Sequence, residues 1–81
     1  MLKKLNEFNI GDSGRITKVE GEGRIRRRLF DMGVTPGADV ILVKRAPLGD
    51  PIEVTIRGYE LTLRKTEASL VTLEILEEGT K

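Results

Sequence analysis

Residue types that carry much of protein chemistry are missing from this sequence. The 81 residues include no cysteine, no histidine and no tryptophan, and only three aromatic residues. Without cysteine there is no disulfide, no zinc-finger spacing and no thiol nucleophile, and without histidine there is no imidazole base. Neither serine, Ser13 or Ser69, has a plausible base beside it. We therefore expect no catalytic residues and a protein that is not an enzyme.

Metal and cofactor sites are poorly supported as well. A transition-metal site would have to consist of carboxylates alone, which select such metals weakly, so we expect none. The segment Gly21-Glu22-Gly23 resembles the start of a dinucleotide-binding loop, but the third glycine and the parallel βαβ setting are missing. We interpret it as a turn between a strand and a helix, and we expect no cofactor.

Long apolar runs are also lacking. No run is long enough to cross a bilayer, and the first residues do not read as a signal peptide, so we expect a cytoplasmic protein without direct membrane insertion. The net charge is +1, but residues 1–45 carry 10 basic and 6 acidic side chains, a net of +4, and residues 46–81 carry a net of −3. This basic excess is small for a protein that depends on phosphate contacts, so we do not expect a nucleic-acid partner.

The hydrophobic pattern predicts one domain over residues 1–81 that is all-β with one short helix. Strands are expected at 15–20, 40–43, 52–56, 59–63 and 71–75, with a two-residue hairpin at 57–58, a helical turn at 65–69, helical spacing at 2–8 and a flexible tail at 77–81. The three-residue spacing of Ile16 and Val19 predicts a bulge in the first strand. The run 40–43 is continuously apolar, which is typical of a strand buried on both faces or in a tight barrel. Together these elements predict a small five-stranded antiparallel barrel with the helix between strands one and two.

The helix is expected over residues 23–32. Ile25, Leu29 and Met32 recur at i, i+4 and i+7 and define its core face. Gly33 suits the left-handed position after the helix, and Val34 stands where a Schellman turn returns the chain onto Leu29. The predicted core comprises Ile16, Ile25, Leu29, Met32, Val40, Leu42, Val54, Ile56, Leu61, Leu63, Val71 and Leu73.

The opposite face of the helix carries candidate partner-binding residues. If Ile25 faces the core, then Arg26, Arg27 and Phe30 face away from it. Arginine and aromatic residues are enriched in interfaces, so we predict a protein contact with Phe30 as anchor and the arginines as steering charges. The alternative is that Phe30 packs under the N-terminal segment.

A second candidate contact lies in the loop at residues 46–51, which two prolines bracket. Its prolines lower the entropy of the unfolded chain, so the loop can simply be a stiffened connection. It can equally be a preformed contact loop with Leu48 at its tip, and we expect it near the arginine-bearing helix face.

Several short motifs occur in a specific order along the chain. They are Arg28-Leu29, Met32-Gly33-Val34, Pro36-Gly37, Ala46-Pro47, Gly49-Asp50-Pro51, Gly58, Leu61, Leu63-Arg64 and Glu67-Ala68. With Gly11, Gly14 and Ile16 before them, this arrangement resembles the ferrous iron transport protein A family, FeoA, over roughly Leu5 to Ile75. Val34 stands where that family often carries leucine.

The resemblance implies an SH3-like β-barrel and a small cytosolic accessory protein of ferrous iron uptake. The implied partner is a membrane ferrous iron transporter with a cytoplasmic GTPase domain. In the resembling proteins, the same barrel also occurs as a regulatory domain fused at the end of iron-dependent repressors. The alternative is therefore a regulatory or nucleic-acid-binding barrel that uses Arg24 to Arg28. Weak homo-oligomerisation, iron sensing and the direction of any effect on the partner's GTP hydrolysis stay open.

Overall fold

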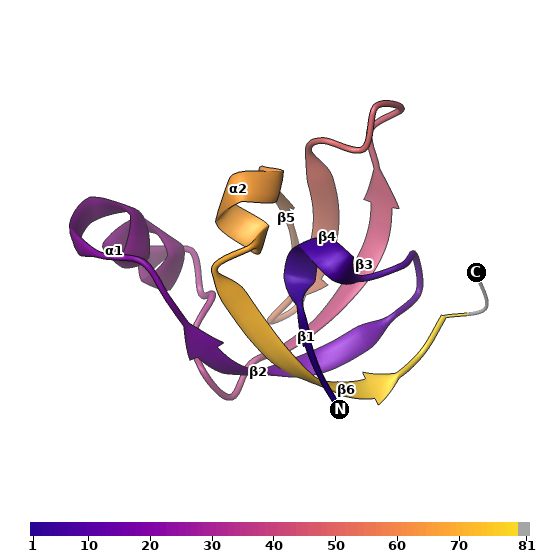
Figure 1. Ribbon diagram of the computed structural model, residues 1–81, viewed down its shortest axis with the longest axis horizontal. Coiled ribbons are helices and arrows are strands. Elements are labelled where there is room, and N and C mark those ends of the chain that lie inside the picture. The colour runs from indigo at the N-terminus through magenta and orange to yellow at the C-terminus, as the bar shows by residue number, and fades with distance from the viewer. Residues whose placement is uncertain (80–81) are drawn as a thin grey trace.

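A single antiparallel sheet of six strands curls around the core in the computed structural model, which describes residues 1–79 (Figure 1). The spatial order of the strands is β1-β6-β2-β3-β4-β5. Three short helical segments accompany them. The elements in chain order are β1 (Leu2–Lys4), the 3-10 turn η1 (Leu5–Glu7), β2 (Ser13–Val19), α1 (Gly23–Asp31), β3 (Asp39–Arg45), β4 (Ile52–Ile56), β5 (Tyr59–Leu63), α2 (Lys65–Ala68) and β6 (Val71–Glu77).

The five predicted strands are confirmed as β2 to β6, but the predicted count of five is wrong because β1 is a sixth. β1 pairs with the middle of β6, and the paired residues are about 70 positions apart in the sequence. No pattern of neighbouring residues could therefore have predicted this strand. Only the second part of the predicted helical spacing at 2–8 is helical, as η1. The predicted bulge in β2 is confirmed between Ile16 and Lys18.

The C-terminal end differs from the expected tail at its beginning. Glu77 belongs to β6, and the backbone N–H of Gly79 donates a hydrogen bond to Asp12 Oδ1 at 2.6 Å. Residues 80 and 81 lie outside the described residues, so the flexible tail stays a prediction for them.

The core contains most of the predicted residues and several that the pattern missed. Ile25 is 36% exposed, so its assignment to the core is wrong. Met32 and Leu61 are half-buried against the core rather than inside it. The buried hydrophobic residues are Leu5, Phe8, Ile16, Val19, Leu29, Val34, Ala38, Val40, Leu42, Ile52, Val54, Ile56, Leu63, Ala68, Val71 and Leu73.

The apolar run 40–43 is not buried on both faces. Val40 and Leu42 point into the core, whereas Ile41 and Val43 are exposed on the outer face of β3. This alternation fits the barrel interpretation of the run and leaves its outer side uncovered among the described residues.

The C-terminal end of α1 has the predicted Schellman turn. The N–H of Val34 donates to Leu29 O at 3.0 Å, and the N–H of Gly33 donates to Phe30 O at 3.0 Å. Gly33 has φ 91°, a left-handed conformation that glycine adopts without steric cost. Val34 is buried, so the turn fixes where the helix ends against the barrel.

The rotation of α1 about its axis can be tested by comparing two truncations on the same helix. Leu29→Ala removes a fully buried side chain and should lower the free energy of unfolding by about 2–5 kcal/mol. Ile25→Ala should lower it by clearly less, because Ile25 is 36% exposed at the edge of the core and leaves no closed cavity when truncated. Urea denaturation followed by circular dichroism measures both values, and equal losses would contradict the rotation seen here.

A buried carboxylate, Asp12, joins both ends of the chain to the sheet. Its oxygens accept hydrogen bonds from the N–H groups of Asn9 (2.8 Å) and Gly79 (2.6 Å), and Lys3 Nζ lies 3.7 Å away. Burial alone raises the pKa of Asp12, but the two backbone hydrogen bonds and the Lys3 charge outweigh it, so the pKa lies below its ordinary value. The ionised form of Asp12 is therefore the one that the fold stabilises.

This shift predicts an acid dependence of stability. The contribution of Asp12 is fully present above the pKa of an unfolded aspartate, about 3.9, and is lost as the pH falls below it toward the lower folded-state pKa. Asp12→Asn should therefore lower stability at pH 7 by about 1–3 kcal/mol and flatten the decline between about pH 5 and 2. Asp39→Asn is the control. The pKa of Asp39 is also lowered, but its carboxylate is exposed, and an exposed ion pair contributes little to stability. If the acid dependence of Asp12→Asn matched that of the wild type, this assignment would be wrong.

Candidate functional site

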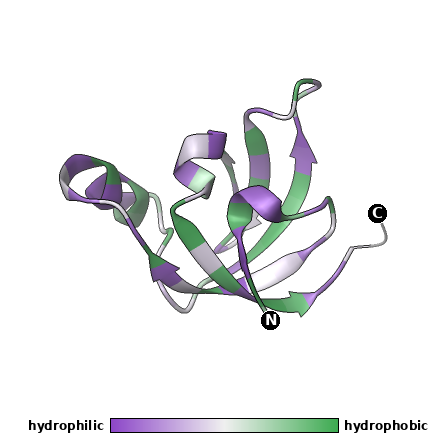
Figure 2. Ribbon diagram, viewed as in Figure 1, coloured by the Kyte–Doolittle hydropathy of each residue, from purple (hydrophilic) through white to green (hydrophobic). Residues whose placement is uncertain are grey.

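Helix α1 projects from one end of the barrel and is the most basic element of the protein (Figures 1 and 2). Because Leu29 points into the core, the outward side of the helix carries Arg24 and Arg27, which are neighbours at i and i+3. Within residues 1–79, neither guanidinium makes a hydrogen bond or an ion pair, whereas those of Arg26 and Arg28 do. The free positive charge of α1 is thus concentrated on two of its four arginines.

The predicted outward position of Phe30 is wrong. Its ring is half-buried and packs against the core, because Leu29 rather than Ile25 marks the inward direction. Arg26 lies over this ring, with its guanidinium carbon 4.6 Å from the centroid, and its Nε donates to Val19 O at 3.1 Å. Arg26 and Phe30 therefore hold α1 against β2, although the Arg26 side chain is also exposed to solvent.

The β4–β5 hairpin binds the C-terminal end of α1. Arg57 Nε donates to Gly33 O at 3.1 Å, and Arg57 Nη2 donates to Thr35 Oγ1 at 2.6 Å. The hydroxyl of Tyr59 donates to Met32 O. The Tyr59 hydroxyl thus satisfies a carbonyl group at the end of the helix, and Arg57 holds the residues just after it, so the hairpin fixes the end of α1.

Arg57 and Gly58 form the predicted two-residue hairpin turn. Both have positive φ, 50° and 85°, as a type I′ turn requires. Asparagine, aspartate or glycine is the usual choice at the first position. An arginine there accepts an unfavourable backbone conformation, and its side chain reaches α1.

A second attachment joins α1 to α2. Arg28 Nη1 lies 2.7 Å from Glu67 Oε2, and Glu67 is only 5% exposed. The other oxygen of Glu67 accepts the backbone N–H of Arg64 at 3.0 Å. Both residues belong to motifs that the sequence analysis singled out, but their pairing links positions 39 residues apart and has no local signal.

The loop between β3 and β4 places Leu48 at its tip, as predicted, and Leu48 is 95% exposed. The N–H of Ala46 donates to Pro51 O at 2.9 Å, and the N–H of Gly49 donates to Ala46 O at 2.7 Å, so the loop is closed by its own backbone. Beside it lies a cleft of about 380 Å³ with Pro47 and Pro51 on its walls.

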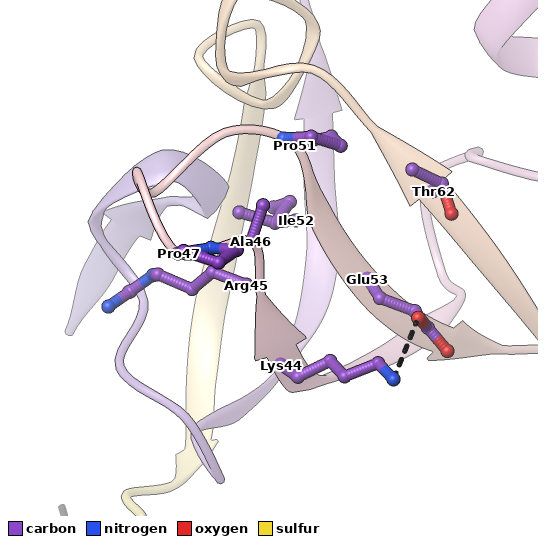
Figure 3. Close-up of a pocket in the computed structure, with 8 residues that line it drawn as sticks. All are labelled: Lys44, Arg45, Ala46, Pro47, Pro51, Ile52, Glu53 and Thr62. Carbon is purple, nitrogen blue, oxygen red and sulfur yellow. Dashed lines mark ion pairs between the residues drawn. The ribbon is translucent and has the colours of Figure 1, made fainter.

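The cleft has charged groups at one end (Figure 3). Lys44 Nζ and Glu53 Oε1 lie 3.8 Å apart there. The pKa of Glu60 on β5 is raised, first because its carboxyl shares a hydrogen bond with Glu53 and then because the two charges repel. Within residues 1–79, no group of three or more carboxylates is placed to hold a metal ion.

The two candidate contacts do not form one surface. Figure 1 shows α1 at the left of the molecule and the 46–51 loop at the upper right, with α2 and β5 between them in this view. The expectation that Leu48 lies near Arg26, Arg27 and Phe30 is therefore wrong. The loop extends from the β3–β4 end of the sheet, whereas α1 follows the opposite end of β2.

The Arg28–Glu67 contact can be separated from the general effect of removing an arginine from α1. Arg28→Ala leaves the buried Glu67 carboxylate without its ion pair and should lower the free energy of unfolding by about 1–3 kcal/mol. Arg27→Ala is the matched control and should change it by no more than about 0.5 kcal/mol. Both are measured by urea denaturation at pH 7. Equal losses in the two variants would mean that the ion pair does not stabilise the fold.

Comparison with known proteins places the chain in a family. The family model of the FeoA domain matches residues 3–75. The Fe(2+) transport protein A/Fe(2+) transporter FeoB fusion protein of Porphyromonas gingivalis is 36% identical over 76 residues, which are 94% of this chain and 9% of that protein. The chain therefore spans about a tenth of the length of this curated relative.

Solved structures agree with this assignment. The NMR structure of a FeoA-like protein from Clostridium acetobutylicum has a TM-score of 0.88 and 36% identity, covering 99% of this chain and 93% of that one. The zinc complex of FeoA from Stenotrophomonas maltophilia, described as an SH3 domain protein, has a TM-score of 0.76 and 28% identity over 89% of each chain. The six-stranded sheet with its one projecting helix is thus an SH3-like barrel, and the chain belongs to the FeoA family.

Proposed function

We propose that this protein is a non-enzymatic accessory protein of ferrous iron uptake that binds the cytoplasmic GTPase part of a membrane ferrous iron transporter. The observation that carries the proposal is the outward face of α1, where Arg24 and Arg27 make no ion pair and outnumber the one exposed acidic residue, Asp31, while Arg26 and Arg28 contact the barrel. The fused relative supports the choice of partner, because there an FeoA domain and an FeoB transporter share one chain.

The free arginines suit an acidic protein surface. Two like charges at i and i+3 slightly destabilise a helix, and this helix has no side-chain hydrogen bond at its N-cap. An acidic partner would relieve that repulsion and accelerate the encounter.

The contact residues of this proposal differ in part from those expected from the sequence. Arg27 remains and Arg24 joins it, whereas Arg26 and Phe30 support the helix from its inner side. Leu48 is a separate contact candidate on the loop between β3 and β4.

No helix among residues 1–79 is long and apolar enough to span a membrane. The proposed encounter is at the cytoplasmic side because the proposed partner is the cytoplasmic GTPase part of the transporter.

The proposal predicts the behaviour of a charge reversal on α1. Arg24→Glu with Arg27→Glu should slow association with the isolated cytoplasmic GTPase domain of the cognate transporter by about tenfold or more at low salt. The same variant should show a weaker salt dependence of the association rate. Biolayer interferometry over a range of salt concentrations measures both.

The matched control is Arg64→Glu with Lys65→Glu, which changes the net charge equally from positions outside α1. It should slow association by less than about threefold. Equal slowing by both variants would mean that only net charge matters and would refute the α1 surface. Salt-sensitive binding of the wild type to RNA or DNA, without capture of the transporter domain, would instead support the regulatory or nucleic-acid-binding alternative.

A further inference from the structure

The outer face of β3 and the end of β6 carry exposed apolar side chains that α1 and the Leu48 loop do not explain. Ile41 and Val43 project outward from β3, and Leu76 projects from β6 with 48% of its surface exposed. Ile10 is 46% exposed and precedes Gly11, whose N–H donates to Leu42 O at 2.8 Å, so its backbone adjoins β3. We call these four residues the β3–β6 patch.

The strand register explains how the patch is assembled. Ser13 on β2 lies opposite Ile41 on β3 and opposite Glu77 on β6. Because Gly14 is paired with Ile75, Leu76 has no partner on β2 and occupies a bulge. Leu76 and Ile41 consequently line one hollow of about 320 Å³ on the outside of the barrel.

Other strands show what an outer face exposed to water carries in this protein. The outward positions of β4 are Glu53 and Thr55, and those of β5 include Glu60 and Thr62. β3 departs from this rule, since its apolar run continues through both faces (Figure 2). Such a run is expected where both faces of a strand are covered, yet nothing among the described residues covers the outer one.

We propose that the β3–β6 patch is the contact between two copies of this chain. A two-fold interface requires a surface that complements itself. The patch has an apolar centre and charges of both signs around it. Arg15 and Asp39 form an ion pair within one copy, Lys44 lies 3.8 Å from Glu53, and Glu77 is exposed. Two facing copies can exchange partners among these exposed pairs around the joined apolar side chains.

The charges at the rim also argue against other occupants. An anionic lipid or nucleic-acid surface would select a basic rim, and an acidic protein would be repelled by Asp39 and Glu77. The Arg15–Asp39 pair, with 2.8 Å between Nε and Oδ1, keeps both signs at the edge of the hollow. The outward face of α1, by contrast, carries Arg24 and Arg27 against the single acidic residue Asp31, so two copies of it would meet with like charges in excess.

The size of the patch sets the strength of the dimer. A standard interface removes about 800 Å² from each partner, which is a large share of the 4,986 Å² surface of this molecule. Four half-exposed apolar residues are a small centre for such an interface. We therefore expect a weak, reversible dimer with a Kd of about 10–1,000 μM.

Sedimentation velocity of the full chain from about 10 μM to about 1 mM spans this range of Kd. The wild type should shift from monomer to dimer. Ile41→Thr with Leu76→Ser should raise the Kd by about tenfold or more, whereas Leu48→Ser, which removes an exposed leucine outside the patch, should change it by less than about twofold. Arg15→Glu keeps the apolar centre and should raise the Kd by about threefold or more, because it breaks the charge pairing.

Thermal unfolding of each variant confirms that it is folded, and the exposed positions should leave Tm almost unchanged. A wild type that stays monomeric throughout would overturn the proposal, as would equal weakening by Leu48→Ser. If the wild type is monomeric and the double variant loses capture of the transporter domain, the patch belongs to the transporter contact instead. An unchanged Kd in Arg15→Glu would remove the charge argument for a second copy.

Discussion

The attachment of α1 to the barrel determines which side chains this protein presents at that end. Leu29 is buried in the core, the Schellman turn at Gly33 stops the helix, and the hairpin residues Arg57 and Tyr59 bind its last carbonyl groups. A nine-residue helix with this sequence would be marginal on its own. The same contacts therefore stabilise the helix and fix its rotation.

The rotation of α1 separates its four arginines into two groups with different roles. Arg26 and Arg28 turn back onto the fold, to Val19 O and to the buried Glu67, while Arg24 and Arg27 remain in solvent. Arg57 in the β4–β5 turn adopts a left-handed backbone conformation that is unfavourable for arginine. In this position its side chain makes two hydrogen bonds to Gly33 and Thr35, just after α1. The orientation of the basic face of α1 is thus fixed by the packing of Leu29 in the core and by the hairpin contacts at the end of the helix.

Sequence reasoning succeeded where the signal is local. The alternation in β4 and β5, the turn at Arg57-Gly58, the bulge after Ile16 and the Schellman turn at Gly33 each follow from a few neighbouring residues. It failed where distant segments meet. The strand β1 forms only by pairing with β6, which is distant in the sequence. The helical periodicity could not distinguish Ile25 from Leu29 as the inward-facing residue, and taking Ile25 as inward placed Phe30 on the outward face.

The candidate site shows the same division. Leu48 at an exposed tip was predictable, since two prolines and a glycine bracket it, but its distance from α1 depends on how the whole sheet curls. The central claim is that the free face of α1 is where a partner binds, and NMR titration of the ¹⁵N-labelled protein with the transporter's cytoplasmic GTPase domain tests it most directly. The account predicts that the amide signals of residues 23–27 shift or broaden first while those of residues 46–51 stay in place. Perturbation confined to residues 46–51, with α1 unaffected, would contradict it.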